Sequence, residues 1–170
     1  MKLKFDERGA PFVSLEEGES AVVLSDMHLG SRAKGGGSCD LESLCRFLRD
    51  LYEGRVEVEG RKLKSPSLLA LLGDVLEFWC GDPDTVLRDF YPVARVVLPA
   101  RSLKLYVAGN HDKIVGKIVL ETAGGEPDFL VAPEYAVLES GGRKFALVHG
   151  HQFDSLFYRL GGLWKIESYV

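Results

Sequence analysis

The chain has 170 residues, 46% hydrophobic and 27% charged, a balance typical of one folded globular domain and unlike that of a disordered segment. Its 25 acidic residues outnumber 21 Lys and Arg, so the net charge of -4 gives no electrostatic reason to expect duplex nucleic acid as a partner. Three cysteines without a Cys-x-x-Cys pair argue against a disulfide scaffold or zinc ribbon, and without an apolar run of membrane-spanning length we expect a soluble, cytoplasmic protein.

Short apolar runs bounded by Gly, Asp, Asn or Ser predict the strands. In chain order these lie at residues 11–15, 21–25, 68–72, 103–108, 135–139 and 143–148. We expect the first to be a short edge strand, and the apolar runs that precede polar segments to be buried. Ser140-Gly141-Gly142 indicates a hairpin between the last two strands, and alternating charge over 55–64 predicts another, exposed hairpin.

Apolar residues at three- and four-residue spacing predict the helices, which lie at residues 40–53, 85–98 and 113–122. Pro92 lies inside the second, where we expect a break or kink. The Gly-rich loop 30–37 lacks the spacing of a phosphate-binding loop, and we interpret it as a mobile rim. Residues 155–170 are amphipathic and end without a helix cap. We therefore expect a single domain over 1–170, incomplete at its C-terminus, with 155–170 as the start of a cap or connecting helix.

All four histidines lie in short polar segments at the ends of predicted strands or directly after them. Three segments carry the histidines: Ser25-Asp26-Met27-His28, Gly109-Asn110-His111-Asp112 and His149-Gly150-His151. A fourth polar segment of the same kind, Gly73-Asp74-Val75-Leu76-Glu77, has no histidine. Because strand ends converge at one edge of an α/β sheet, carboxylate, amide and imidazole groups from four places would meet in one cleft. A hydrogen-bonded turn explains one such segment, but four of them with no histidine left over favour a metal site.

These residue types suit the hydrolysis of a phosphoester. Two divalent ions about 3.5–4 Å apart lower the pKa of a bridging water and hold the transition-state oxygens. Asp74 fits the bridge, with Asp26 and His28 on one ion and Asn110 and His149 on the other. A ligand set of oxygen and nitrogen without thiolate favours manganese, iron or zinc over calcium.

His111 follows Asn110 in the same turn, so we expect its side chain to face the substrate instead of the metal. A protonated imidazole there could give its proton to the leaving oxygen, and Glu77 could fix the tautomer of His111 and raise its pKa. The alternative is a histidine whose hydrogen bonds are satisfied by the backbone.

In their order along the chain, the four polar segments resemble the motifs of the calcineurin-like metallophosphoesterases, and the resemblance covers roughly residues 21–151. It implies an α/β fold in the form of a four-layer sandwich, with two mixed sheets flanked by helices. It also implies a dimetal centre, often with manganese, and hydrolysis of phosphomonoesters, phosphodiesters or pyrophosphate bonds through a dimetal-bridged hydroxide. The family's general-acid role falls on His111, and its ligand roles fall on Asp26, His28, Asp74, Asn110 and His149.

Residues 73–82 are similar to the Gly-Asp-x-x-Glu-x-Trp-x-Gly-Asp stretch of the UDP-2,3-diacylglucosamine pyrophosphohydrolase branch. That branch usually has Arg where this chain has His111, so its lipid substrate does not transfer. We interpret Trp79 as a core residue, with a wall of the substrate pocket as the alternative. The family's final Gly-His-x-His is absent from the chain. We therefore expect either a fragment or two ions each one ligand short, with His151 as a candidate replacement.

These observations together predict a metal-dependent phosphoesterase with two divalent ions, manganese favoured, acting on a small phosphorylated or nucleotide-linked substrate. We expect little activity from this form without excess manganese. The alternative is a catalytically weak scaffold or protein-binding module on the same fold, similar to retromer subunits. A nuclease is disfavoured by the acidic balance of the chain and the absence of a DNA-binding extension.

Overall fold

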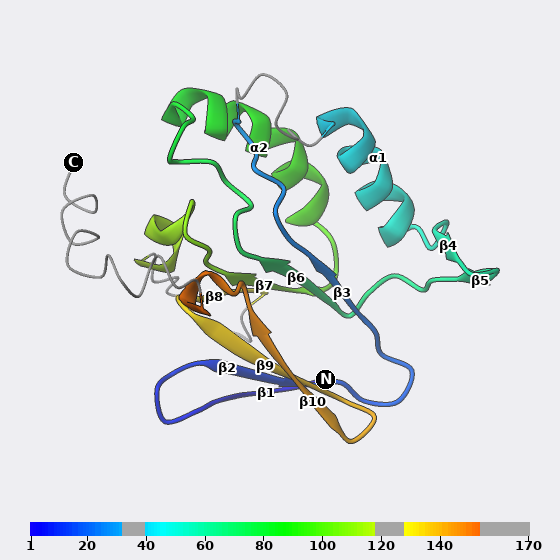
Figure 1. Cartoon of the computed structure of the whole chain (residues 1–170). Coiled ribbons are helices and arrows are strands. Elements are labelled where there is room, and N and C mark those ends of the chain that lie inside the picture. The colour runs from blue at the N-terminus through cyan, green and yellow to red at the C-terminus, as the bar shows by residue number, and fades with distance from the viewer. Residues whose placement is uncertain (32–39, 118–127, 154–170) are drawn as a thin grey trace.

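The computed structural model describes residues 1–31, 40–117 and 128–153, which form two four-stranded sheets, a small hairpin and two α-helices (Figure 1). The first sheet is parallel, with its strands in the order β3 (Ala21–Leu24), β6 (Leu68–Leu72), β7 (Leu103–Val107) and β8 (Phe129–Ala132). The second is mixed, in the order β1 (Lys2–Phe5), β2 (Pro11–Ser14), β9 (Tyr135–Ser140) and β10 (Arg143–Val148). The remaining elements are α1 (Leu41–Tyr52), α2 (Pro83–Val97), the hairpin β4 (Glu57–Val58) and β5 (Arg61–Lys62), and 3-10 turns at Lys113–Lys117 and His151–Phe153.

The described residues are arranged in three layers, with α1 and α2 on one face of the first sheet and the second sheet on its other face (Figure 1). Strand β6 shows why, because its residues alternate between two separate cores. Leu69 and Leu71 belong to the core under the helices, whereas Leu68 and Ala70 belong to the core between the sheets. A strand buried on both faces needs a continuous apolar run, as the sequence has here. The expected α/β class is confirmed.

Both helices begin at an aspartate whose side chain caps the first turn. Asp40 accepts a hydrogen bond from the Glu42 backbone N–H at 3.2 Å, and Asp82 accepts one from Thr85 at 2.9 Å. Helix α2 starts two residues earlier than expected, because Pro83 suits the first helical position. Of the break or kink expected at Pro92, a break is excluded, because the helix continues through Pro92 to Val97. A proline inside a helix costs about 3 kcal/mol, and the buried α2 side chains of Val86, Val93 and Val97 offset that cost.

The strands that the sequence predicted are all present, and two more were missed. Strand β1 carries only one partly buried residue, whereas β8 is a run of four apolar residues that the prediction overlooked. Strand β2 was expected at an edge but lies between β1 and β9. The expectation of burial holds for β6 and β7 but is wrong for β3 and β10, which are edge strands of their sheets. Val23 is 40% exposed and Phe145 is 48% exposed.

Three expectations fall wholly or partly outside the described residues: most of the rim over 30–37, half of the helix over 113–122, and the amphipathic segment 155–170. Within the described ranges, residues 113–117 form a 3-10 turn. None of the helices in these ranges is long and apolar enough to cross a membrane.

Candidate metal centre

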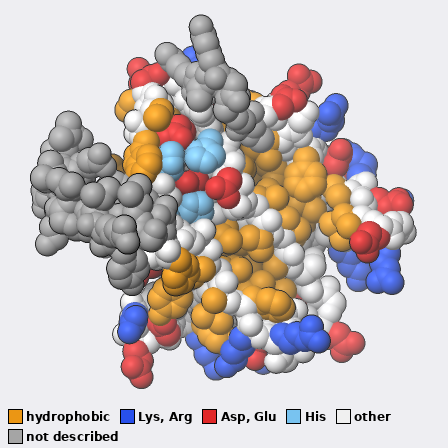
Figure 2. Space-filling model, viewed as in Figure 1, with side chains coloured by type: hydrophobic (Ala, Val, Ile, Leu, Met, Phe, Trp, Pro, Cys, Tyr) orange, Lys and Arg blue, Asp and Glu red, His pale blue; other side chains and the backbone are white. Residues whose placement is uncertain are grey.

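The polar segments meet at one end of the molecule, as expected, but they come from both sheets. Three of them follow the parallel neighbours β3, β6 and β7 at their carboxyl ends, where such sheets place their sites. His149 follows β10 in the second sheet, so the expectation of a single sheet edge is wrong for this segment. Figure 2 shows the resulting cluster of histidine and acidic side chains on one face of the molecule.

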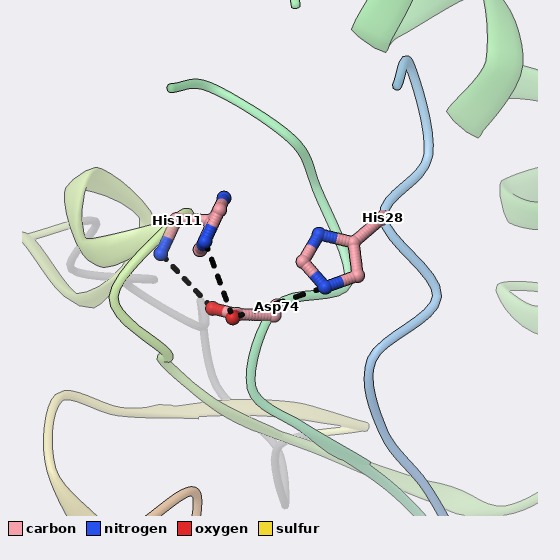
Figure 3. A group of neighbouring side chains, drawn as sticks. All are labelled: His28, Asp74 and His111. Atoms are coloured by element: carbon pink, nitrogen blue, oxygen red, sulfur yellow. Dashed lines mark hydrogen bonds and ion pairs between the residues drawn. The ribbon is translucent and has the colours of Figure 1, made fainter. Parts of the chain in front are cut away.

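Asp74 lies at the centre of the cluster and is only 4% exposed (Figure 3). Its Oδ2 atom lies 3.1 Å from Nε2 of His149, 3.8 Å from Nε2 of His111 and 4.0 Å from Nε2 of His28. Its Oδ1 atom accepts a hydrogen bond from the His111 backbone N–H at 2.9 Å. One carboxylate oxygen is therefore held by the backbone, while the other faces three imidazole rings.

The ligand atoms form two groups that share Asp74. His28, Asp74 and His111 make one group, and Asp26, Asp74 and His149 make the other, with all atoms in a group within 4.8 Å of one another. A shared carboxylate between two groups of nitrogen and oxygen donors fits a pair of divalent ions. The grouping differs from the expected one, because Asp26 lies with His149 and His111 lies with His28.

Glu77 holds two of the three rings in place. This carboxylate is 4% exposed, and its oxygens lie 2.9 Å from Nδ1 of His28 and 2.8 Å from Nδ1 of His111. It also accepts hydrogen bonds from the backbone N–H groups of Trp79 and Cys80. A carboxylate on Nδ1 leaves Nε2 to face the ligand position, as is usual for histidines that bind metals. The sequence pointed to the Glu77–His111 pair but missed His28, which is 49 residues away in the chain.

The environment of Glu77 favours its ionised form. Burial alone would raise its pKa, but hydrogen bonds from His111, His28 and the Cys80 N–H outweigh burial, so the net effect lowers the pKa of Glu77. An ionised Glu77 accepts from both rings at once, which fixes the same tautomer in each.

Three of the candidate ligands have left-handed backbone conformations. Asp26, His28 and Asp74 have φ values of 55°, 47° and 51°, and in the described ranges only Glu59 among other non-glycine residues has a positive φ. Each such residue costs about 1–2 kcal/mol and persists only where its surroundings hold it. Here hydrogen bonds join the loops: Asp26 N–H donates to Gly73 O at 3.1 Å and His28 N–H to Asp74 O at 2.9 Å.

Two glycines allow the segments to approach one another. A Cβ atom on Gly73 would lie 2.3 Å from Cγ of His149, and one on Gly109 would lie 2.2 Å from Oδ1 of Asp74. Both distances are far below ordinary contact, so a side chain at either position would displace a candidate ligand.

The remaining predicted residues lie around this centre. Asn110 is partly buried and immediately precedes His111. His151 has its ring 5.5 Å from that of His149 but belongs to neither ligand group within the described residues. Burial, followed by the nearby His149, lowers the pKa of His151.

Trp79 is not a core residue. Its side chain is 49% exposed, and its ring centroid lies 4.2 Å from that of His111 at an interplanar angle of 33°. The indole therefore covers one side of the His111 ring and lies beside the site, which agrees with the alternative interpretation of a pocket wall.

No protein-family model matches the chain. It is similar to curated bacterial proteins named UDP-2,3-diacylglucosamine hydrolase. The protein from Serratia proteamaculans is 26% identical over 133 residues, 77% of this chain and 48% of the relative. The one from Pseudomonas entomophila is 25% identical over 151 residues, 88% of this chain and 54% of the relative. The one from Xanthomonas oryzae pv. oryzae is 30% identical over 91 residues, 52% of this chain and 35% of the relative. The chain thus spans about half the length of the first two of these relatives.

Proposed function

We propose that this chain carries the catalytic centre of a metal-dependent hydrolase that cleaves a phosphomonoester, phosphodiester or pyrophosphate bond. The convergence of three imidazole Nε2 atoms on one buried oxygen of Asp74 carries the proposal. The left-handed backbone at three of the candidate ligands supports the proposal, because residues in energetically unfavourable backbone conformations are concentrated at functional sites. The similarity to UDP-2,3-diacylglucosamine hydrolases independently favours a hydrolase.

We propose that the site holds two divalent ions, with manganese favoured and iron or zinc as alternatives. The residues that would hold them are Asp26, His28, Asp74, Asn110 and His149. When bound, such ions would lower the pKa of a water and neutralise charge on the phosphate. In this assignment Asp74 would help to hold both ions, since it belongs to both ligand groups. Glu77 orients His28, and the loop contacts between Asp26, His28 and the Gly73–Asp74 backbone keep the ligands together.

His111 is the proposed general acid. In the doubly protonated ring, Glu77 would hold the Nδ1 proton while the proton on Nε2 passes to the leaving oxygen. The competing role is that of a metal ligand, because Nε2 of His111 lies in the same group as His28 and Asp74. The two roles differ in a measurable way. Loss of a ligand lowers metal affinity, whereas loss of an acid slows turnover in proportion to how much the leaving group needs a proton.

The proposed substrate is small and phosphorylated or nucleotide-linked. The names of the relatives indicate a UDP-linked substrate for those proteins, and the exposed face of Trp79 beside His111 offers a flat surface against which a base or sugar could stack. A scaffold on the same fold would have no need for one carboxylate, Glu77, that orients two imidazole rings toward a second carboxylate, Asp74.

Several finer expectations stay predictions: the cytoplasmic location, the absence of a duplex nucleic acid partner, and the fourth layer of the sandwich.

The test uses the full chain with Mn²⁺ or with a chelator, and one probe for each bond class: 4-nitrophenyl phosphate, bis(4-nitrophenyl) phosphate and UDP-glucose. We expect Mn²⁺-dependent hydrolysis of at least one probe, lost in Asp74→Asn. Asp50→Asn is the matched control, because Asp50 pairs with Arg55 on the surface of α1, outside the ligand cluster. Stoichiometric Mn²⁺ in Asp74→Asn, or no Mn²⁺-dependent turnover of any probe by the parent chain, would contradict the proposal.

A further inference from the structure

Asp112 is a fully buried carboxylate next to the candidate site, with an exposed fraction of 0%. It belongs to neither ligand group among the described residues. A buried carboxylate is costly unless hydrogen bonds compensate for its lost hydration. The donors that surround Asp112 therefore show what it does.

Four donors from three different segments meet on this side chain. Oδ2 accepts from the Val75 N–H at 2.8 Å, from the Leu76 N–H at 3.3 Å and from the Tyr106 hydroxyl at 2.6 Å. Oδ1 accepts from the Gly109 N–H at 2.6 Å. Asp112 thus joins the loop after β6, strand β7 and the loop after β7.

These contacts fall on both sides of the Asp74–His111 pair. Val75 directly follows Asp74, whose backbone is left-handed, and anchoring the next two N–H groups opposes relaxation of that conformation. Gly109 lies two residues before His111, and a Cβ atom on it would lie 2.2 Å from Oδ1 of Asp74. The anchored loops are the ones joined by the His111 N–H bond to Asp74 Oδ1.

Tyr106 supports the carboxylate from the strand below. Its side chain is 2% exposed, and burial, followed by the charge of Asp112, raises the pKa of Tyr106 far above its ordinary value. The phenol therefore stays protonated and donates to Asp112. Hydrogen bonds to a charged acceptor are the stronger kind, so this donor helps to compensate the buried charge.

We propose that Asp112, oriented by Tyr106, is a positioning residue that sets Asp74 and His111 relative to each other without touching metal or substrate. Its link to metal affinity rests on the proposed function, while its effect on the two loops does not. Asparagine at this position keeps the shape but replaces one acceptor oxygen with a donor. Either the Gly109 N–H or the Val75 and Leu76 N–H groups then lose their acceptor.

The test compares Asp112→Asn with Leu51→Ala, a matched destabilised control. Leu51 is fully buried at the end of α1 beside Tyr52, which contacts Ser102 before β7, at the opposite end of the first sheet from the site. Two measurements are made on each full chain: amide hydrogen exchange at Val75, Leu76 and Gly109 in metal-free protein, and titration with Mn²⁺. The first readout needs no metal and no activity.

In Asp112→Asn we expect exchange at one or more of these amides to accelerate by about 10-fold or more relative to amides of β9, since 1.4 kcal/mol is a factor of ten. Mn²⁺ affinity should fall roughly 10–100-fold, the usual effect of losing a partner behind the ligands. Leu51→Ala should lower thermal stability without either change. Unchanged exchange and affinity in Asp112→Asn, or the same losses in Leu51→Ala, would overturn the proposal.

Tyr106→Phe keeps the proposal testable if Asp112→Asn does not fold. It removes only the hydroxyl donor, so we expect a smaller acceleration at Val75 and Leu76 in the same direction, and no change there would count against the proposal. In the double variant Asp112→Asn, Tyr106→Phe, the second substitution should accelerate amide exchange less than Tyr106→Phe does alone, because both residues act through one contact. If the parent chain binds no Mn²⁺, the proposed function fails and the exchange result alone decides the role of Asp112.

Discussion

Gly73→Ala should damage the candidate site through a single methyl group. The new Cβ would lie 2.3 Å from both Cγ and Nδ1 of His149 and 2.6 Å from its Cβ. Ordinary carbon contacts begin near 3.5 Å, so the ring must move by about 1 Å. The backbone at Gly73 also has a φ of +70°, which adds a cost of about 1–2 kcal/mol for any residue with a side chain.

The displaced ring belongs to the group formed by Asp26, Asp74 and His149, in which His149 Nε2 lies 3.1 Å from Asp74 Oδ2. A misplacement of about 1 Å can cost roughly 100-fold in rate, and we expect a loss of Mn²⁺ affinity of about 10-fold or more from the weakened group. Titration of Mn²⁺ into metal-stripped protein measures the affinity, and thermal unfolding measures the stability.

Gly18→Ala is the matched control, because Gly18 has a φ of +83° but no atom within 4 Å of the added Cβ. It bears the backbone cost alone, which should lower the melting temperature by about 2–8 °C for a chain of this size and leave metal affinity unchanged. If Gly73→Ala binds Mn²⁺ as tightly as Gly18→Ala does, the close approach of Gly73 to His149 has no role in the site and the reasoning fails.

Three further predictions concern individual side chains of the cluster. Asp74→Ala should reduce bound metal more than Asp26→Ala, since only Asp74 belongs to both ligand groups; equal metal content by elemental analysis would refute this. Glu77→Ala should weaken Mn²⁺ binding by roughly 10–100-fold because it frees two rings at once, whereas retention of full affinity would show that the rings need no such support. His111→Ala should slow an alkyl phosphodiester by about 10²–10⁴-fold but a nitrophenyl ester much less, and equal losses on both, together with lost metal, would favour the ligand role instead.

Much of this architecture was predictable because its signals are local. The apolar runs before Asp26, Asp74 and Asn110 indicated strands, and parallel strands bring their carboxyl ends together whatever the loops between them contain. Asp40 and Asp82 cap their helices in the way that the residue types suggest. The position of Asp74 at the centre follows from the same logic, because β6 lies between β3 and β7 in the sheet.

The contacts that were missed depend on side-chain directions across long separations. Nothing in the spacing of His28 and Glu77 shows that they meet, since a left-handed turn at His28 directs the ring. The membership of β10 in a second sheet was equally hidden, because a hairpin signal does not say which sheet the hairpin joins. Trp79 was taken for a core residue because aromatic residues are usually buried, yet it lies in the turn over 78–80 and its side chain is about half exposed.

The division of the site between two sheets has a consequence for variation in this protein. His149 is carried by one layer and the other candidate ligands by another, so their alignment depends on the thickness of the core between the layers. Leu105 and Leu138 belong to that core. Protein interiors are so densely packed that adding or removing one methylene group displaces the neighbouring atoms. A change of side-chain volume in this core would therefore shift the two layers relative to each other. Residues deep between the sheets can therefore tune the chemistry at the surface, and neutral drift in this core is constrained by the spacing of the ligands as well as by stability.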